Sequence, residues 1–229
     1  IELNPNYAIA YCNLGSIVRD LGKLKEAEIS TRKAIELNPD YAEAHYNLGI
    51  LFFDLGNLQE ANLSYRKAIE LKPAYAKAHY NLGILFIDLG KLQEAEISLR
   101  KAIDLNPDFA MAYNALSLLK YSDNNQKWHK QLFSKNILNN KLPKEQVDLY
   151  FARANILHKK KEYKNSSKNL QLANDLKLNL HPTNANTLIN KSITLLMESD
   201  KQASNKIEST NFPESIFIVG MPRSGSTLL

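Results

Sequence analysis

Hydrophobic and polar positions in the first half of the chain follow a helical period that restarts every 34 residues. Within each unit, apolar residues recur three and four positions apart, so they share one face of a helix. One glycine divides each unit into two helices, and a proline closes it because proline cannot continue a helix interior. The glycines are Gly22, Gly56 and Gly90, and the prolines are Pro5, Pro39, Pro73 and Pro107. We expect helices near residues 8–20, 25–37, 42–54, 59–71, 76–88 and 93–105.

Small residues also recur at fixed places in these units. The first helix carries a Leu-Gly pair and the second helix two alanines, which allow two helices to approach closely. Larger side chains beside them, at Phe52, Phe86, Tyr65 and Leu99, are expected to fill the remaining space. The pairs are Leu14-Gly15, Leu48-Gly49 and Leu82-Gly83; the alanines are Ala27, Ala61, Ala95, Ala34, Ala68 and Ala102.

This 34-residue helix–turn–helix unit resembles the tetratricopeptide repeat (TPR). The resemblance covers residues 1–121, as three full repeats and the first helix of a fourth, and implies an all-α superhelical solenoid. Residues 1–5 are interpreted as the end of a preceding repeat. The family's first-helix tryptophan is replaced by Tyr11, His45, His79 and Tyr113. We expect the two histidines to pack in this column, and we expect no metal site.

The pattern weakens after residue 121, and residues 122–199 are interpreted as a degenerate TPR-like helical region. Ser117 already stands where glycine is expected, and Arg153 stands where leucine is expected. A short irregular helix is expected near Trp128–Ile137, a fifth unit after Pro143, and a last helix from Thr183 or Asn184 to about Ser199. The fifth unit keeps the register at Tyr150, Ala154, Tyr163, Leu170 and Ala173. Residues 200–214 have almost no apolar content and are predicted to be a linker.

Composition and charge limit the partners. Residues 1–119 carry 12 Lys/Arg against 15 Asp/Glu, whereas residues 120–206 carry 16 against 7. The basic part is interpreted as a solvated face and not as a nucleic-acid surface, because its lysines are scattered without interleaved aromatic residues. No run of 18 apolar residues exists, so no membrane partner is expected. Cys12 is the only cysteine, which fits the cytoplasmic location that we expect.

Asn13, Asn47 and Asn81 occupy one place in three successive units. Their amides offer a donor and an acceptor, which match the polar groups of a peptide backbone. The superhelix of O-GlcNAc transferases is similar, with an asparagine ladder in its groove, which implies a protein or peptide partner in the concave TPR groove. The alternative is that these residues bond locally or were copied with the repeat. Asp20, Asp54 and Asp88 recur on the same face, and Ala115 interrupts the asparagine series.

The last residues, SIFIVGMPRSGSTLL, contain a second candidate site. An apolar run leads into a glycine-bounded loop, and a helix is expected to start at about Ser226, where backbone N–H groups bind anions. Ser226 replaces the lysine of nucleotide-triphosphatase loops, so ATP or GTP hydrolysis is not expected. Positive charge comes from Arg223, whose planar fork suits a tetrahedral oxyanion.

The stretch FIVGMPRSGSTLL resembles the 5′-phosphosulfate motif of sulfotransferases, especially the tyrosylprotein branch. The resemblance implies that Arg223, Ser224, Gly225, Ser226 and Thr227 hold the cofactor 3′-phosphoadenosine 5′-phosphosulfate (PAPS), and that Arg223 stabilises the transition state. It also implies a bacterial TPR-sulfotransferase, of which residues 215–229 are the first strand and loop of a truncated α/β domain. We expect this fragment to be catalytically incompetent and to bind no PAPS by itself. The alternative is a TPR protein-interaction scaffold without enzymatic activity.

Overall fold

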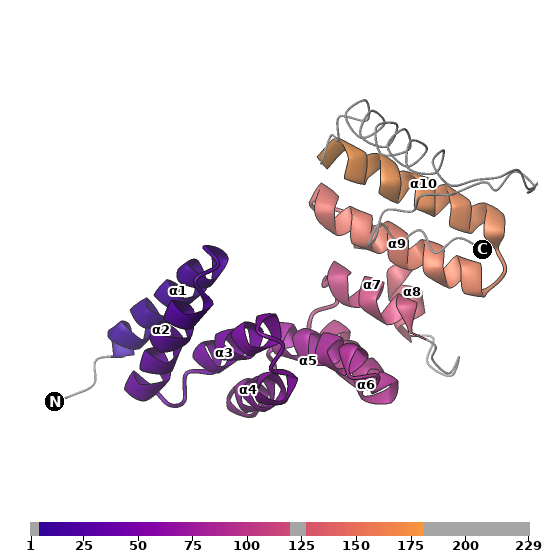
Figure 1. Ribbon diagram of the computed structural model, residues 1–229. Helices are drawn as coiled ribbons and strands as arrows, with labels where there is room; N and C mark the ends of the chain where they lie inside the picture. The colour runs from indigo at the N-terminus through magenta and orange to yellow at the C-terminus, as the bar shows by residue number, and fades with distance from the viewer. Residues whose placement is uncertain (1–4, 120–126, 181–229) are drawn as a thin grey trace, which may run out of the picture. The chain divides into compact units, whose positions relative to one another are not determined.

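A computed structural model describes residues 5–119 and 127–180, which form helices joined by short turns (Figure 1). The helices are α1 (Pro5–Asp20), α2 (Leu24–Leu37), α3 (Ala42–Asp54), α4 (Leu58–Leu71), α5 (Ala76–Asp88), α6 (Leu92–Leu105), α7 (Ala110–Leu118), α8 (Lys127–Leu132), the 3₁₀ turn η1 (Lys135–Leu138), α9 (Pro143–Lys159) and α10 (Tyr163–Leu180). No strand occurs within these two ranges. The six expected helices of the repeats are confirmed, each with bounds within three residues of the expectation. The expected last helix, the linker and the strand and loop of residues 215–229 lie outside the described residues.

Helices pack in sequence order, which is what a 34-residue repeat predicts. Each of α1, α3 and α5 packs against the helix that follows it, and α1 contacts α3 as α3 contacts α5. The small residues permit this close approach. A Cβ atom on Gly49 would lie 2.6 Å from the ring of Tyr65, and one on Gly83 would lie 2.7 Å from Cγ of Leu99. The expected fit of large side chains against these glycines is therefore confirmed.

The turn inside each unit needs a left-handed backbone. Gly22, Gly56 and Gly90 have φ of 78°, 77° and 71°, and no atom lies within 4 Å of where their Cβ atoms would be. In the fifth unit the corresponding residue is Lys161, with φ of 62°. A side chain at these positions has room, so the cost of one is conformational and not steric.

We expect Gly56→Ala to lower the free energy of unfolding by about 1 kcal/mol, because alanine is disfavoured in this conformation. The opposite change, Lys161→Gly, should raise it by up to about 1 kcal/mol for the same reason. Urea denaturation followed by circular dichroism measures both. If both substitutions change the free energy of unfolding in the same direction and by the same amount, the explanation by the left-handed backbone is wrong.

The fourth unit has only a short second helix, and residues of α9 complete it. Arg153 donates from Nε to the carbonyl oxygen of Leu132 at 2.9 Å and from a terminal nitrogen to that of Ser134 at 3.0 Å. Lys159 donates to the carbonyl oxygens of Ser117 and Leu119, each at 2.6 Å. Both cations therefore stabilise carbonyl groups that the ends of α8 and α7 leave unpaired. This role explains why Arg153 occupies a leucine position.

The serine that replaces glycine in α7 has a comparable role. Ser117 is fully buried, and its hydroxyl donates to the carbonyl oxygen of Asn114 at 2.7 Å. The same hydroxyl oxygen accepts a hydrogen bond of 2.9 Å from Asn155 in α9. The departures from the repeat pattern at positions 117 and 153 thus join the fourth unit to the fifth. The expected irregular helix is confirmed in part, as α8 and η1 with a break between them.

Candidate peptide-binding surface

The first helices of the units present the asparagines and aspartates that the sequence singled out. We call this the first-helix surface, formed by residues of α1, α3 and α5 and by the aromatic residues that precede the first helices. Its repeated positions are Asn13, Asn47 and Asn81; Cys12, Tyr46 and Tyr80; Asp20, Asp54 and Asp88; and Tyr41, Tyr75 and Phe109. Because α1, α3 and α5 contact one another in order, each set runs from unit to unit.

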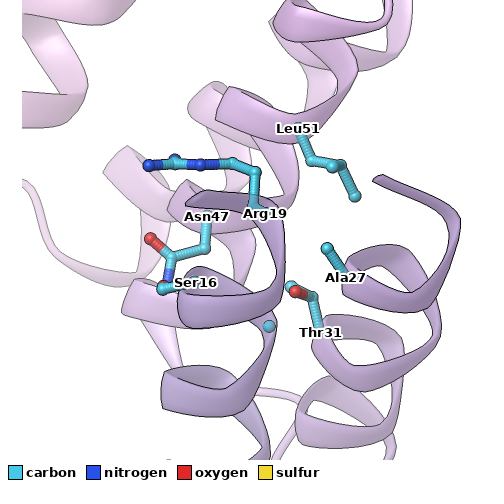
Figure 2. A pocket seen from close by; sticks show the side chains of 7 residues that line it. Ser16, Arg19, Ala27, Thr31, Asn47 and Leu51 are labelled. Atoms are coloured by element: carbon cyan, nitrogen blue, oxygen red, sulfur yellow. The ribbon is translucent and has the colours of Figure 1, made fainter. Parts of the chain in front are cut away.

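Two of the asparagines form hydrogen bonds to the preceding unit. Asn47 is half-buried, and its amide nitrogen donates to the hydroxyl oxygen of Ser16 at 2.9 Å and to the sulfur of Cys12 at 3.1 Å. Figure 2 shows the side chain of Asn47 beside that of Ser16. Asn81 likewise donates to the hydroxyl oxygen of Tyr46 at 3.1 Å. These bonds join α3 to α1 and α5 to α3.

The amide donors of Asn47 and Asn81 are thus used inside the protein, while their acceptors are not. Among the described residues, none donates a hydrogen bond to the side-chain oxygen of Asn47 or Asn81. Asn13 is exposed and shows no side-chain hydrogen bond to another described residue. A peptide clamp by these residues stays a prediction. The group that all three asparagines have available for a peptide is the side-chain oxygen, which accepts hydrogen bonds. Local bonding, the alternative interpretation, accounts for the donors of Asn47 and Asn81.

Aromatic rings line the same surface at the starts of the first helices. The ring centroids of Tyr46 and Tyr75 are 4.9 Å apart, and those of Tyr80 and Phe109 are 5.0 Å apart, so the contact repeats with the unit. Burial raises the pKa of Tyr46 and raises that of Tyr80 to about 12. Both phenols therefore stay protonated at neutral pH and keep a hydroxyl that can donate a hydrogen bond. The sequence pattern behind these contacts was missed, although Tyr41, Tyr75 and Phe109 are also 34 residues apart.

Acidic side chains end the first helices. Asp20, Asp54 and Asp88 are all exposed at the last positions of α1, α3 and α5. Arg19 forms an ion pair with Asp20 at 2.7 Å and lies 3.9 Å from Asp54, whereas Asp88 has no ion pair with a described residue. The surface therefore offers carbonyl and carboxylate acceptors in repeated positions.

The pocket drawn in Figure 2 lies among α1, α2 and α3 and is not a ligand site. Its walls include Ser16, Thr31 and Asn47, and it has essentially no room for a water molecule. Thr31 stands where the next two units have Tyr65 and Leu99. The gap is therefore explained by a small side chain at a position that a large one fills in the other units.

Three residues of the tryptophan column, His45, His79 and Tyr113, each reach a carbonyl group six residues earlier. Nε2 of His45 lies 2.8 Å from the carbonyl oxygen of Pro39, and Nε2 of His79 lies 3.1 Å from that of Pro73. The hydroxyl of Tyr113 donates to Pro107 at 3.0 Å. Burial lowers the pKa of His79, although the hydrogen bond of His79 to the carbonyl group of Pro73 opposes the effect. These side chains thus attach α3, α5 and α7 to the turns that precede them.

No group of three or more His, Cys, Asp or Glu residues suited to a metal ion occurs among the described residues. The described part of the chain also contains no helix with the length and hydropathy needed to cross a membrane. The motif residues Arg223, Ser224, Gly225, Ser226 and Thr227 lie outside the described residues, so their role in binding PAPS stays a prediction.

An acid–amide pair joins the fourth unit to the fifth. The side chain of Asn114 in α7 donates to Oδ1 of Asp148 in α9 at 2.9 Å. Burial raises the pKa of Asp148, although the bond from Asn114 partly offsets this. A carboxyl group with a raised pKa in the folded state holds its proton more tightly when folded. Its contribution to stability is therefore full below the unfolded pKa and is lost as pH rises through the folded pKa.

We therefore expect Asp148→Asn to be more stable than the wild type at pH 7. Asparagine keeps an oxygen that accepts from Asn114 but carries no charge to desolvate. The advantage should disappear at acidic pH, where Asp148 is protonated. Melting temperatures recorded from pH 3 to pH 8 measure this, with the exposed substitution Asp88→Asn as control. A stability difference that does not depend on pH would contradict the prediction.

Models of known families match the repeats of the first half of the chain. One described as TPR repeat matches residues 15–56 and 49–90, and one described as Tetratricopeptide repeat matches residues 76–109. Residues 15–109 are tetratricopeptide repeats. The matched TPR region contains Asn47 and Asn81, whereas Asn13 lies just before it. A comparison with curated proteins finds no match.

Solved structures similar to this chain include three named proteins. PilF of Pseudomonas aeruginosa is similar with a TM-score of 0.59 and 22% identity, over 87% of this chain and 88% of that chain. MamA is similar with a TM-score of 0.47 and 23% identity, over 79% and 84% of the two chains. The first TPR of Spaghetti (RPAP3), solved with the HSP90 peptide SRMEEVD, has a TM-score of 0.49 and 25% identity, over 51% and 92%. The likeness to PilF supports a helical TPR solenoid.

Proposed function

We propose that the TPR region binds an extended segment of a partner protein along the first-helix surface, in a protein that transfers a sulfuryl group from PAPS to a hydroxyl acceptor. The observation that carries the first half is the repetition of unused acceptors from unit to unit. The side-chain oxygens of Asn13, Asn47 and Asn81 recur every 34 residues, on helices that contact one another in order. Such a series suits a ligand that is itself periodic, as a polypeptide backbone is.

The chemistry of the surface favours a partner that supplies donors. Backbone N–H groups suit the amide oxygens, and Lys or Arg side chains suit the carboxylates at Asp54 and Asp88. The rings of Tyr46 and Tyr80 add apolar area beside these groups and a hydroxyl each. The partner segment that fits best is therefore extended, with basic side chains.

The second half of the proposal rests on the sequence FIVGMPRSGSTLL. Arg223 supplies a fixed positive charge, and the backbone N–H groups of Gly225, Ser226 and Thr227 supply oriented donors for the 5′-phosphosulfate. PAPS supplies the sulfuryl group, and the negative charge that builds on the leaving phosphate is what such donors stabilise. The motif itself supplies neither the acceptor site nor the general base. The TPR region would bring the acceptor protein to this chemistry.

The test uses the full-length protein, radiolabelled PAPS and panels of peptides and glycans. Transfer of label to a peptide, reduced when the TPR region is removed, is the expected result. Binding of peptides without any transfer would favour the alternative, a TPR interaction scaffold without enzymatic activity. Transfer to acceptors that is indifferent to the TPR region would contradict the recruiting role.

Substitution of the asparagines separates binding from stability. We expect the double variant Asn47→Ala and Asn81→Ala to weaken peptide binding by roughly 1–3 kcal/mol, at about 0.5–1.5 kcal/mol for each hydrogen bond. It should also lower the free energy of unfolding, because it removes the bonds to Ser16 and Tyr46. Asn13→Ala is the matched variant, since Asn13 has no such bond to a described residue and should affect binding alone.

Calorimetry with a peptide selected from a display library measures the binding, and thermal denaturation measures the stability. Asn47→Asp and Asn81→Asp provide a further control, because aspartate keeps the acceptor and loses the donor. If the alanine variants lose stability and bind the peptide normally, the asparagines are structural and the clamp is wrong.

A further inference from the structure

A groove separate from the first-helix surface lies between the second helices α4 and α6. Its volume is about 670 Å³, and α5 forms its floor. Ile69, Leu82 and Phe86 give the groove an apolar interior, and Ile97 stands on its α6 wall. The side chain of Ile97 is 69% exposed, although it is a large apolar residue. The exposed apolar side chain of Ile97 therefore stands beside the apolar interior of the groove.

The charges at the edges of the groove are balanced. Three are positive and three are negative: Arg66, Arg100 and Lys101, with Glu70, Glu94 and Asp104. A strongly acidic or strongly basic ligand would meet as much repulsion as attraction here. The groove instead suits a partner whose own charges alternate in sign.

Two of these charges flank Ile97 and have no ion pair with a described residue. Glu94 precedes Ile97 by three positions and Lys101 follows it by four, so all three share one face of α6. In α2 and α4 the lysines that correspond to Lys101 are paired: Lys33 with Glu36 at 2.8 Å and Lys67 with Glu70 at 2.7 Å.

The acid that would pair with Lys101 is used elsewhere. Asp104 takes the place of Glu36 and Glu70, and it is bound at 2.7 Å by Lys127 of α8. The third unit therefore presents an acidic, an apolar and a basic side chain in a line, and the two charged members lack a partner on the described chain.

We propose that this groove is the contact between two copies of the chain, with their α6 helices antiparallel about a two-fold axis near Ile97. An antiparallel copy reverses the order of the line, so Glu94 of each copy faces Lys101 of the other. Ile97 of each copy then enters the apolar groove of the other. One surface serves both copies, as a two-fold contact requires. The first-helix surfaces stay available for partners.

Sedimentation velocity measures the association of the protein. Concentrations from about 1 to about 200 μM cover the range in which weak dimers dissociate. The wild type should dimerise, and Ile97→Asp should raise the dissociation constant by roughly tenfold or more, because it puts a charge into the apolar contact. Ile29→Asp is the matched control. Ile29 occupies the same place in α2 and is 70% exposed, but it does not line the groove, so the dimer should persist.

Charge reversal tests the antiparallel arrangement directly. Glu94→Lys alone and Lys101→Glu alone should each weaken the dimer, because each brings like charges together in both symmetric contacts. An equal mixture of the two variants should form a heterodimer, since both contacts are then between opposite charges. Circular dichroism checks that each variant is folded. A monomeric wild type, a dimer that survives Ile97→Asp, or a mixture of folded variants that stays monomeric would each overturn the proposal.

Discussion

Tyr65→Ala should lower the free energy of unfolding by about 3–5 kcal/mol, the range for truncation of a large buried aromatic side chain. Tyr65 is only 2% exposed, and its ring lies where α3 approaches α4 at Gly49. Its centroid is 6.1 Å from that of Tyr46 on the first-helix surface. Removing the ring leaves a cavity at a site where the backbone of α3 has no side chain to fill it. Urea denaturation of the purified protein measures the loss.

The repeat supplies its own controls for this substitution. Tyr65→Leu introduces the residue that the third unit has at Leu99 and removes less volume than alanine does, so it should cost less than Tyr65→Ala. Thr31→Ala removes much less volume at the corresponding place of the first unit and should cost about 1 kcal/mol. If Tyr65→Ala and Thr31→Ala have equal effects, the explanation by cavity formation is wrong.

Under the proposed function, Arg223→Ala in the full-length protein should reduce the rate of sulfuryl transfer by the equivalent of about 2–4 kcal/mol, which is a factor of roughly 30 to 1,000. The reason is the loss of a charge and of two parallel donors at the developing negative charge of the leaving phosphate. Arg223→Lys keeps the charge and loses the fork, so its effect should be smaller. Steady-state assays with labelled PAPS give kcat and KM for each variant.

A control for Arg223 must remove a positive charge elsewhere. Lys164→Ala does so at an exposed position of α10 and should leave kcat and KM unchanged. An Arg223→Ala enzyme with normal kinetics would show that this loop is not the phosphosulfate site. The proposal that the TPR region binds a peptide would remain, and the asparagine variants would still test it.

The helices of the repeats were predictable because the same pattern of apolar and small residues occurs three times in the sequence. At a single glycine such as Gly56 the signal is weak, but its recurrence at Gly22 and Gly90 distinguishes a turn from chance. The buried partners of the first-helix glycines followed from the same repetition, as Tyr65 and Leu99 show. Arg153 was recognised as a departure, yet its bonds to Leu132 and Ser134 were not predictable. They depend on the path of a segment that has no counterpart in the other units.

The asparagine ladder was predictable as a series of residues and not as a set of bonds. Asn47 reaches Ser16 and Cys12, which lie 31 and 35 residues earlier, so its partners are set by how α3 packs on α1. Sequence spacing alone does not tell whether an amide on a helix faces solvent or the neighbouring helix. The charges beside Ile97 that have no ion pair with a described residue were not predictable for a similar reason. Lys101 lacks its usual acidic partner because Asp104 of α6 pairs with Lys127 of α8, and sequence spacing does not show this contact.

The equal length of the repeats has a consequence for how such a protein changes in evolution. A deletion of residues 42–75 would join Tyr41 to Ala76 and remove one unit of 34 residues. α5 would then follow α2, and Asn81 would inherit the position from which Asn47 donates to Ser16 and Cys12. First helices of neighbouring units contact one another in the same order at each boundary, so recombination within the gene can shorten or lengthen the first-helix surface and keep that packing.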